Sequence, residues 1–478
     1  MLFSSFEFLL AIPVAYATLV AANLYSQRAF LLALIALSLI FYAWFRAEYV
    51  LILIVSAVWN YLFAASIEQF PDKRIIGLGV TANVLMLVAF KYLNFIIENA
   101  NLVLGQTWPQ IFVVLPIALS FITFEQISFL SDVRNKRVQR GDFVSYLAFV
   151  TLFPKLIAGP IIRYRELLPQ LSSARRITAE QLFTGFCLFC LGLFKKTVLA
   201  DNMGSIVDPS VTSLGEGVIK QIDAICAIVA YSLQIFFDFS GYSEMALGLA
   251  WMFGIRLPVN FFSPYRSSSI IEFWRRWHIT LSSFLRDYIY IPLGGNRRGA
   301  LRTFVNLLIV MLVGGIWHGA AWTFVAWGCL HGLALIANHA WRQLPWSETC
   351  SRNRGLKFAG WAVTSMVILA AWVLFRAPSF GVAGNWFASI WQNHAQPAYM
   401  VSNRQLLLVS ALTLWVIILP NIPTLFRIEW DRDRIDWTKP VGIAPVSLSL
   451  AALSALALSI SVIAMARGQH NAFIYFQF

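Results

Sequence analysis

The sequence has few charged residues. Only 12% of its 478 residues are Asp, Glu, Lys or Arg, whereas 59% are hydrophobic, and the mean hydropathy is +0.69. A soluble domain of this length could not bury so much apolar surface, because surface grows too quickly relative to core. The composition therefore excludes an ordinary soluble protein. Long apolar blocks such as 30–44 and 445–464 are typical of segments that span a bilayer.

The sequence also has little of what metal sites and nucleophile sites are built from. It contains five cysteines, of which Cys187 and Cys190 form a C-x-x-C pair in an apolar run without a second pair or a neighbouring histidine. Packing of small residues in a helix explains that pair better than metal binding. No G-x-S-x-G, P-loop or H-E-x-x-H motif occurs. We expect no metal and no bound cofactor. Because no nucleophile motif is present, any group-transfer chemistry would use either a base that assists direct transfer to the acceptor or a nucleophile elsewhere in the sequence.

The basic residues are gathered between the apolar blocks. The formal net charge of +13 would suggest nucleic acid in a soluble protein, but here it indicates loops on the cytoplasmic side facing anionic lipid headgroups. We expect no nucleic-acid binding. Segments 98–110 and 201–217 have no Lys or Arg and are predicted to be outward loops, which places both termini outside. The predicted cytoplasmic segments are 132–142, 163–176, 275–302, 352–357 and 427–439.

The apolar blocks predict an all-α, polytopic bundle that forms one domain over residues 1–478. We expect about eleven spans, and we expect the two longest blocks, 222–254 and 303–340, to be divided. The N-terminus lacks a basic region and a cleavage site, so the first span is expected to remain. The blocks lie at 7–24, 29–45, 48–66, 75–97, 111–131, 143–160, 181–199, 222–254, 303–340, 358–376, 404–420 and 443–466.

Two segments depart from simple spans. Segment 143–160 lies between basic loops and contains FPKLIAGP, which predicts a re-entrant hairpin entering from the cytoplasmic side beside a cavity. A proline-kinked ordinary span is the alternative. Segment 259–302 is too polar to span, and 270–290 is predicted to be one amphipathic helix at the cytoplasmic interface. Ser267–Ser269 would provide its N-cap.

Ionisable residues inside apolar blocks are the candidate functional residues. His318, in VGGIWHGAAWTF, is costly to bury and would face a cavity or a partner. Burial would keep its imidazole neutral and able to accept a proton, but a histidine hydrogen-bonded between helices fits equally well. Gly314, Gly315 and Gly319 would permit close approach by another helix or by a substrate.

Further polar groups accompany this histidine. His278 lies in WRRWHITL and is either a second catalytic group or an interfacial histidine. Arg275, Arg276 and Arg286 would hold phosphates, or equally well lipid headgroups. Asp238 lies with Glu244 in an otherwise apolar block, so both must face a bundle interior, water or a cation. That polar set would line a passage, orient a histidine or form a structural network; its members are Gln234, Asp238, Ser240, Tyr242, Ser243 and Glu244.

Two long segments carry a family resemblance. NFFSPYRSSSIIEFWRRWHITLSSFLRDYIYIPLGGNRRG and NLLIVMLVGGIWHGAAWTFVAWGCLHG together resemble the membrane-bound O-acyltransferase superfamily, and its bacterial alginate O-acetylase branch in particular. FYAWFR, FPKLIAGPIIRYREL and LQIFFDFSGYSEMALGL extend the resemblance over nearly the whole chain. By position, His318 resembles the central catalytic histidine of the family, and His278 resembles the second histidine.

The resemblance implies a central tunnel, acetyl-CoA as the cytoplasmic donor, and transfer toward an exported polysaccharide through a periplasmic acetyltransferase-like or esterase-like partner. Alginate or cellulose is the expected acceptor, and the bacterial inner membrane the location. The C-terminal segment 468–478 ends in AFIYFQF, which resembles a terminal motif of this branch, so Tyr475 becomes a candidate acyl relay; an aromatic membrane anchor is its alternative. Substrate or donor binding is expected of Asn260, Trp274, Arg275, Arg276, Trp317 and Asp238.

Two functions of other classes compete with an enzyme. A transporter or flippase would use the polar set as a pathway and is expected to carry paired repeats, which the sequence lacks. A non-catalytic scaffold of a polysaccharide-export complex would not need His318.

Overall fold

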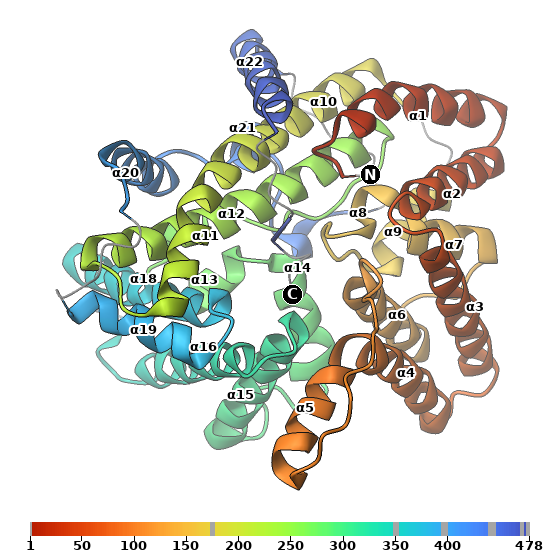
Figure 1. Ribbon diagram of the computed structural model, residues 1–478. Coiled ribbons are helices and arrows are strands. Elements are labelled where there is room, and N and C mark those ends of the chain that lie inside the picture. The colour runs from red at the N-terminus through yellow and green to blue at the C-terminus, as the bar shows by residue number, and fades with distance from the viewer. Residues whose placement is uncertain are drawn as a thin grey trace. The chain divides into compact units, whose positions relative to one another are not determined.

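The described part of the chain is built from helices. The computed structural model describes residues 2–172, 177–347, 353–392, 400–437, 446–468 and 473–474. These residues form α-helices with short π-helical and 3-10 turns, and they contain no strand (Figure 1). The predicted all-α class is confirmed. The chain folds into two compact units, each assembled from segments far apart in the sequence.

Unit 1 comprises Met1–Phe194, Gly241–Val259 and Phe426–Gly468. Several of its helices begin at a serine or aspartate whose side chain accepts a hydrogen bond from the first turn, as Ser5 and Asp142 do. Its elements are α1 (Phe6–Tyr25), α2 (Gln27–Ala43), α3 (Glu48–Gln69), α4 (Lys73–Leu87), η1 (Val88–Tyr92), α5 (Leu93–Leu104), α6 (Leu119–Arg134), α7 (Phe143–Thr151), α8 (Phe153–Leu156), α9 (Tyr164–Ser172), α10 (Ala179–Phe194), η5 (Arg432–Arg434), α22 (Leu448–Ala466) and the end of α12 (Gln221–Met252).

Glycines set the packing of α10 in unit 1. A Cβ atom on Gly185 would lie 2.5 Å from the carbonyl oxygen of Gly248 in α12, and one on Gly192 would lie 2.7 Å from that of Gly241. The two backbones therefore approach closely only because side chains are missing there. Cys187 and Cys190 are buried in the same helix, which fits the packing role predicted for them.

Unit 2 comprises Lys195–Ser240, Asn260–Leu425 and Gln469–Phe478, and it contains the candidate functional residues. Its elements are η2 (Lys195–Ala200), α11 (Asp201–Glu216), the beginning of α12, η3 (Pro264–Arg266), α13 (Ile270–Arg276), α14 (Ile279–Leu285), η4 (Arg286–Tyr290), α15 (Gly299–His318), α16 (Trp322–Trp341), α18 (Arg354–Arg376), α19 (Phe380–Trp391), α20 (Asn403–Ile418) and α21 (Ile422–Leu425).

The chain is a multi-pass membrane protein. Within the described ranges, 8 helical segments are long and apolar enough to cross a bilayer, and two shorter apolar helices, Gln27–Ala43 and Asn403–Ile418, accompany them. The predicted count of eleven spans and the predicted tunnel stay predictions. The 8 segments are Phe6–Tyr25, Glu48–Gln69, Lys73–Leu104, Ala179–Glu216, Gln221–Met252, Gly299–His318, Arg354–Arg376 and Leu448–Ala466.

One of the two predicted divisions is wrong. Block 303–340 does split, because α15 ends at His318 and α16 begins at Trp322. Block 222–254 does not split, because α12 is one helix of 32 residues. At 1.5 Å per residue it is about 48 Å long, more than the hydrocarbon core of about 30 Å requires. Its polar side chains are buried within the protein, so they do not end the helix.

Two further local predictions are wrong. Segment 201–217 is not a loop, because α11 covers Asp201–Glu216 and continues directly from η2. Segment 270–290 is not one helix, because the chain breaks at Trp277 and His278 between α13 and α14. His278 takes a positive φ of 43°, which a helix interior does not allow. Ser269 caps α13 by accepting a hydrogen bond from the Glu272 amide, as predicted.

The predicted interruption of the helix within segment 143–160 is confirmed. α7 ends at Thr151, α8 is a single turn, and no helix follows until Tyr164. The break is held by protein groups: the Phe153 amide donates to Ser38 Oγ at 3.1 Å, and buried Lys155 forms an ion pair with buried Glu125. Irregular backbone is tolerated at membrane depth only with such partners. Entry from the cytoplasmic side stays a prediction.

Candidate active site

His318 is the last residue of α15, in the short break before α16. Gly319, which follows it, has extended backbone (φ −162°), so the helix ends there. A Cβ atom on Gly315 would collide with the Phe324 carbonyl oxygen, and one on Gly319 would collide with the Phe324 ring. The backbone of α16 and the Phe324 ring therefore occupy the space that these two glycines leave open. Close packing of the two helices fixes the position of His318.

Aromatic rings surround His318. Its imidazole centroid lies 5.0 Å from each of the rings of Trp317, Trp327 and Phe375, all in edge-on arrangements. The residue is only 6% exposed. Edge-to-face contacts of this kind restrict the orientation of the imidazole and keep water away from most of it. The prediction that His318 is a buried ionisable residue is confirmed; its catalytic role is not decided by burial alone.

His278 is completely buried and held by a fixed hydrogen-bond network. Its Nδ1 lies 3.1 Å from Oδ1 of Asn260, which also accepts hydrogen bonds from the Thr280 amide (3.2 Å) and hydroxyl (2.9 Å). Because Oδ1 is an acceptor, Nδ1 carries the proton and Nε2 carries the lone pair. His278 lies outside the candidate spans, and burial lowers its pKa to about 3. The imidazole is therefore neutral near pH 7.

Trp317 is the common neighbour of the two histidines. Its ring centroid lies 5.0 Å from that of His318 and 6.3 Å from that of His278. Phe239 meets the His278 ring edge-on at 4.7 Å. Two residues 40 positions apart in the sequence are thus brought into one buried aromatic cluster of unit 2. Trp317, predicted to bind the donor or substrate, packs between two candidate bases.

Sequence reasoning missed His331. This residue of α16 is completely buried, and its Nδ1 accepts a hydrogen bond from Trp274 Nε1 at 3.3 Å. Its ring lies 4.7 Å from that of Trp327, which also contacts His318. The signal was present in the sequence: His331 lies 13 residues after His318 in the same apolar run. The indole N–H of Trp274, a residue predicted to bind donor or substrate, is used in this hydrogen bond to His331.

The three arginines predicted to bind phosphates or lipid headgroups differ in their surroundings. Arg276 forms an ion pair with Glu272 at 2.9 Å, one turn earlier in α13. Arg286 forms an ion pair with Asp287 at 2.7 Å. Arg275 is exposed. Phosphate binding by Arg275 and Arg276 stays a prediction, and for Arg276 it would have to compete with Glu272.

A buried charge cluster in unit 2 contacts the backbone of Ile474. Lys196 of η2 forms ion pairs with Asp238 of α12 at 2.8 Å and with Asp201 of α11 at 2.7 Å. Asp238 thus faces a cation in the interior, one of the surroundings predicted for it. Its other carboxylate oxygen accepts a hydrogen bond from the Ile474 amide at 2.8 Å. The sequence signal for this cluster is the pair of consecutive lysines in the apolar run LFKKTVL.

The last two described residues are therefore inserted into unit 2. Phe473 and Ile474 are both buried, and the Phe473 ring lies 6.0 Å from that of Phe239, the residue that contacts His278. Tyr475 follows immediately, but it lies outside the described residues, so its relay role stays a prediction. Asp238 was expected to bind a substrate or donor; the structure gives it a contact with the protein's own C-terminal segment.

Among the residues that the structure describes, no group of three or more His, Cys, Asp or Glu side chains is placed to hold a metal ion. The expectation that the protein binds no metal stays a prediction. What the arrangement offers chemically is two buried histidines in an aromatic environment, with His278 oriented by Asn260. An imidazole in its neutral form accepts a proton from a hydroxyl group.

The chain belongs to the membrane-bound O-acyltransferase family, which matches residues 41–375. It is 35% identical over 95% of its length, and 95% of the relative's, to a probable alginate O-acetylase of Pseudomonas putida. It is 40% identical to a peptidoglycan O-acetyltransferase of Helicobacter pylori over 72% of this chain and 70% of that one. A teichoic acid D-alanyltransferase of Streptococcus thermophilus is 31% identical over 50% of this chain and 61% of its own. The protein is an acyltransferase, as the resemblance implied.

Proposed function

We propose that the protein transfers an acetyl group from acetyl-CoA on the cytoplasmic side of the bacterial inner membrane toward an exported polysaccharide. The observation that carries the proposal is the placement of two buried histidines against the same tryptophan, Trp317, in unit 2. Two relatives are named as O-acetylases or O-acetyltransferases of alginate and peptidoglycan. An alginate-like acceptor is favoured, because the alginate relative matches nearly the whole length of both chains.

His318 is proposed as the general base. It removes the proton from the acceptor hydroxyl, whose oxygen attacks the thioester carbonyl. A new O–C bond forms, the S–C bond breaks, and the proton passes from the imidazolium to the departing thiolate, giving CoA as the thiol. His278, oriented by Asn260, positions donor or acceptor beside it. The aromatic rings around His318 limit competing attack by water.

Tyr475 is proposed as the first acceptor. Asp238 accepts a hydrogen bond from the amide of Ile474, the residue that precedes Tyr475 in the sequence. A phenol is a competent nucleophile when a base removes its proton. The acetyl-tyrosine would then pass the acetyl group to a periplasmic partner enzyme. Peptide mass analysis of the protein trapped after incubation with acetyl-CoA tests this step. The relay predicts an acetyl adduct on Tyr475, and the absence of that adduct rejects the relay and leaves direct transfer.

Replacement of His318 by alanine tests the proposed function. Loss of a general base lowers rates by about 10²–10⁴-fold, so polysaccharide O-acetylation should fall to background while membrane abundance stays normal. His339→Ala is the matched control, because His339 lies in α16 and is only half-buried. Retained acetylation in His318→Ala would favour a scaffold over the proposed catalytic role of this residue.

A further inference from the structure

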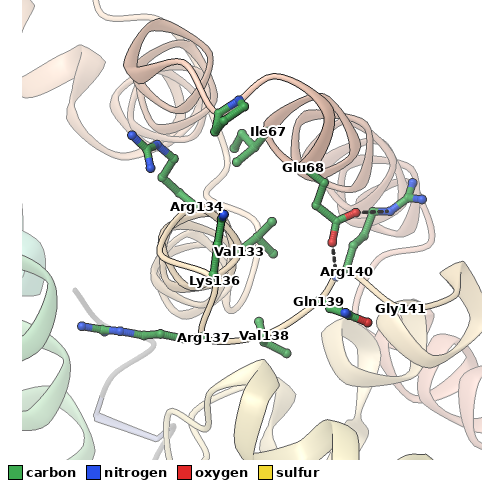
Figure 2. A pocket seen from close by; sticks show the side chains of 11 residues that line it. Ile67, Glu68, Val133, Arg134, Lys136, Arg137, Val138, Gln139, Arg140 and Gly141 are labelled. Atoms are coloured by element: carbon green, nitrogen blue, oxygen red, sulfur yellow. Dashed lines mark hydrogen bonds and ion pairs between the residues drawn. The ribbon is translucent and has the colours of Figure 1, made fainter.

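A basic pocket lies in unit 1, which does not contain the candidate catalytic histidines. Its volume is about 750 Å³, and the end of α3, Pro71, the end of α6 and residues 136–141 line it (Figure 2). That volume is in the range of sites that hold small molecules, about 300–1,000 Å³. Nothing in the proposed acetyl transfer uses this pocket.

The lining is strongly cationic. It contains four basic side chains, Arg134, Lys136, Arg137 and Arg140, against one carboxylate, Glu68. Glu68 is already occupied, because it accepts the Arg140 amide at 2.7 Å and lies 3.5 Å from its guanidinium (Figure 2). A positive potential therefore remains in the pocket, and an anion would be attracted to it.

Arg134 and Lys136 carry this excess charge. Among the described residues neither forms an ion pair, and Arg134 Nε is buried with no hydrogen-bond partner there. Figure 2 shows both side chains beside the end of α6, with the Arg134 guanidinium pointing away from Glu68. Arg137, by contrast, contacts Asp132 at 3.4 Å. A buried donor without an acceptor is costly, and an anionic oxygen would satisfy it.

The wall of the pocket is fixed before any ligand arrives. Tyr164 Oη donates to the Arg140 carbonyl at 2.9 Å, and Tyr61 Oη donates to the Gly141 carbonyl at 2.9 Å. The Arg140 guanidinium lies 4.4 Å from the centre of the Tyr61 ring. The backbone of the loop is therefore held from both sides, and little conformational entropy is lost when an anion binds.

We propose that this pocket binds the phosphate of an anionic ligand at the membrane surface, through Arg134 and Lys136. The pocket lies at the end of α3, one of the candidate spans, and its loop belongs to a strongly basic segment, 132–142, that is predicted on the cytoplasmic side. Headgroups lie at that level, and arginine and lysine are the side chains that bind phosphate oxygens. A phospholipid headgroup and a free phosphate present the same group to the pocket.

The test uses the full chain purified in a non-ionic detergent. Its Tm is measured with soluble dihexanoyl phosphatidylglycerol, with the zwitterionic dihexanoyl phosphatidylcholine, and with inorganic phosphate. A ligand that binds only the folded state raises Tm. We expect a rise of a few degrees with phosphatidylglycerol or phosphate, none with phosphatidylcholine, and loss of that rise in Arg134→Gln/Lys136→Gln.

Matched variants decide the outcome. Arg354→Gln/Lys357→Gln removes the same charge from exposed positions at the start of α18 and should keep the full rise. If the double pocket variant does not fold, Lys136→Gln alone, at an exposed position, should keep part of the rise. A rise with phosphatidylglycerol alone identifies a lipid headgroup, and a rise with phosphate as well identifies a general phosphate site. An equal rise in wild type and pocket variant, or no rise with either anion, overturns the proposal.

Discussion

At the scale of single residues, Asn260 decides what His278 can do. One carbonyl oxygen receives three hydrogen-bonding groups, from the His278 ring and from the amide and hydroxyl of Thr280. Removal of this oxygen would free the orientation of the His278 ring, and a negative charge here would change the protonation of the ring. The Asn260 side chain positions a neighbouring catalytic candidate, and its predicted contact with the donor or substrate stays a prediction.

Asn260→Ala is expected to reduce acetyl transfer by about 10–100-fold, by analogy with the loss seen when the hydrogen-bond partner of a metal-ligating histidine is removed. Asn260→Asp keeps the acceptor oxygen, but its negative charge favours the imidazolium and raises the His278 pKa. If His278 must be neutral, the acid limb of the pH–activity profile should move to higher pH in Asn260→Asp. An unchanged profile would show that the protonation of His278 does not limit the reaction.

Asp238 connects the C-terminal segment to the buried cluster with Lys196. Asp238→Ala removes both the ion pair and the acceptor for the Ile474 amide, and breaking a buried pair costs about 3–5 kcal/mol. Asp238→Asn keeps an acceptor, so it should retain more activity than Asp238→Ala. If Asp238 acts through the tail, deletion of residues 469–478 and Asp238→Ala should have non-additive effects on transfer rate. Additive effects would contradict this connection.

At the scale of elements, the pair α15 and α16 determines where His318 lies. The two helices are continuous in hydrophobic character and are separated only by Gly319, Ala320 and Ala321. Their separation is set by Gly315 on one helix and Gly328 on the other, which face backbone atoms of the partner helix. Of the glycines predicted to admit a helix or a substrate, Gly315 and Gly319 admit α16, whereas a Cβ on Gly314 would meet only Leu285 Cδ1, at 3.4 Å.

Gly315→Ala should therefore lower stability by about 1–3 kcal/mol, because its Cβ has no space against the Phe324 carbonyl. The measurement is the Tm of the purified protein together with its acetyl-transfer rate, and both should fall. Gly384→Ala in α19 is the control, since a Cβ there meets no atom within 4 Å. Equal Tm values for the two variants would show that α15 and α16 can move apart without loss of stability.

At the scale of the whole molecule, the direction of transfer depends on the orientation of the chain in the membrane. Basic segments such as 132–142 predict the cytoplasmic side, and the segment 98–110 without Lys or Arg predicts the outside. The helices establish that the protein crosses the membrane several times, whereas the side on which each end emerges comes from charge alone.

Cysteine labelling checks this orientation in intact cells. In a variant without its native cysteines, Gln106→Cys should react with a membrane-impermeant maleimide added outside, whereas Asn135→Cys should react only after the membrane is opened. Both positions are exposed in the structure. The reverse pattern would turn the basic segment outward and would contradict a cytoplasmic donor.

Much of the architecture was predictable because membrane insertion leaves a strong mark on the sequence. Spans need apolar runs, so most helix positions followed from the pattern, and the break in 143–160 followed from FPKLIAGP. The errors have a common cause. Composition did not reveal that Asp201 pairs with Lys196 and lies in a helix, or that His278 takes a positive φ between two helices, since both depend on neighbours far away in the chain.

The sequence by itself determined the membrane class, the helical fold and the family, because hydrophobic runs and long motifs depend only on the order of residues. It also singled out His318 and His278. Only the tertiary structure decided that Trp317 contacts both histidines, that Asn260 sets the tautomer of His278, that His331 belongs to the same aromatic cluster, and that Asp238 holds Ile474. Such contacts arise when distant helices pack, and their geometry comes from close packing that no local pattern records.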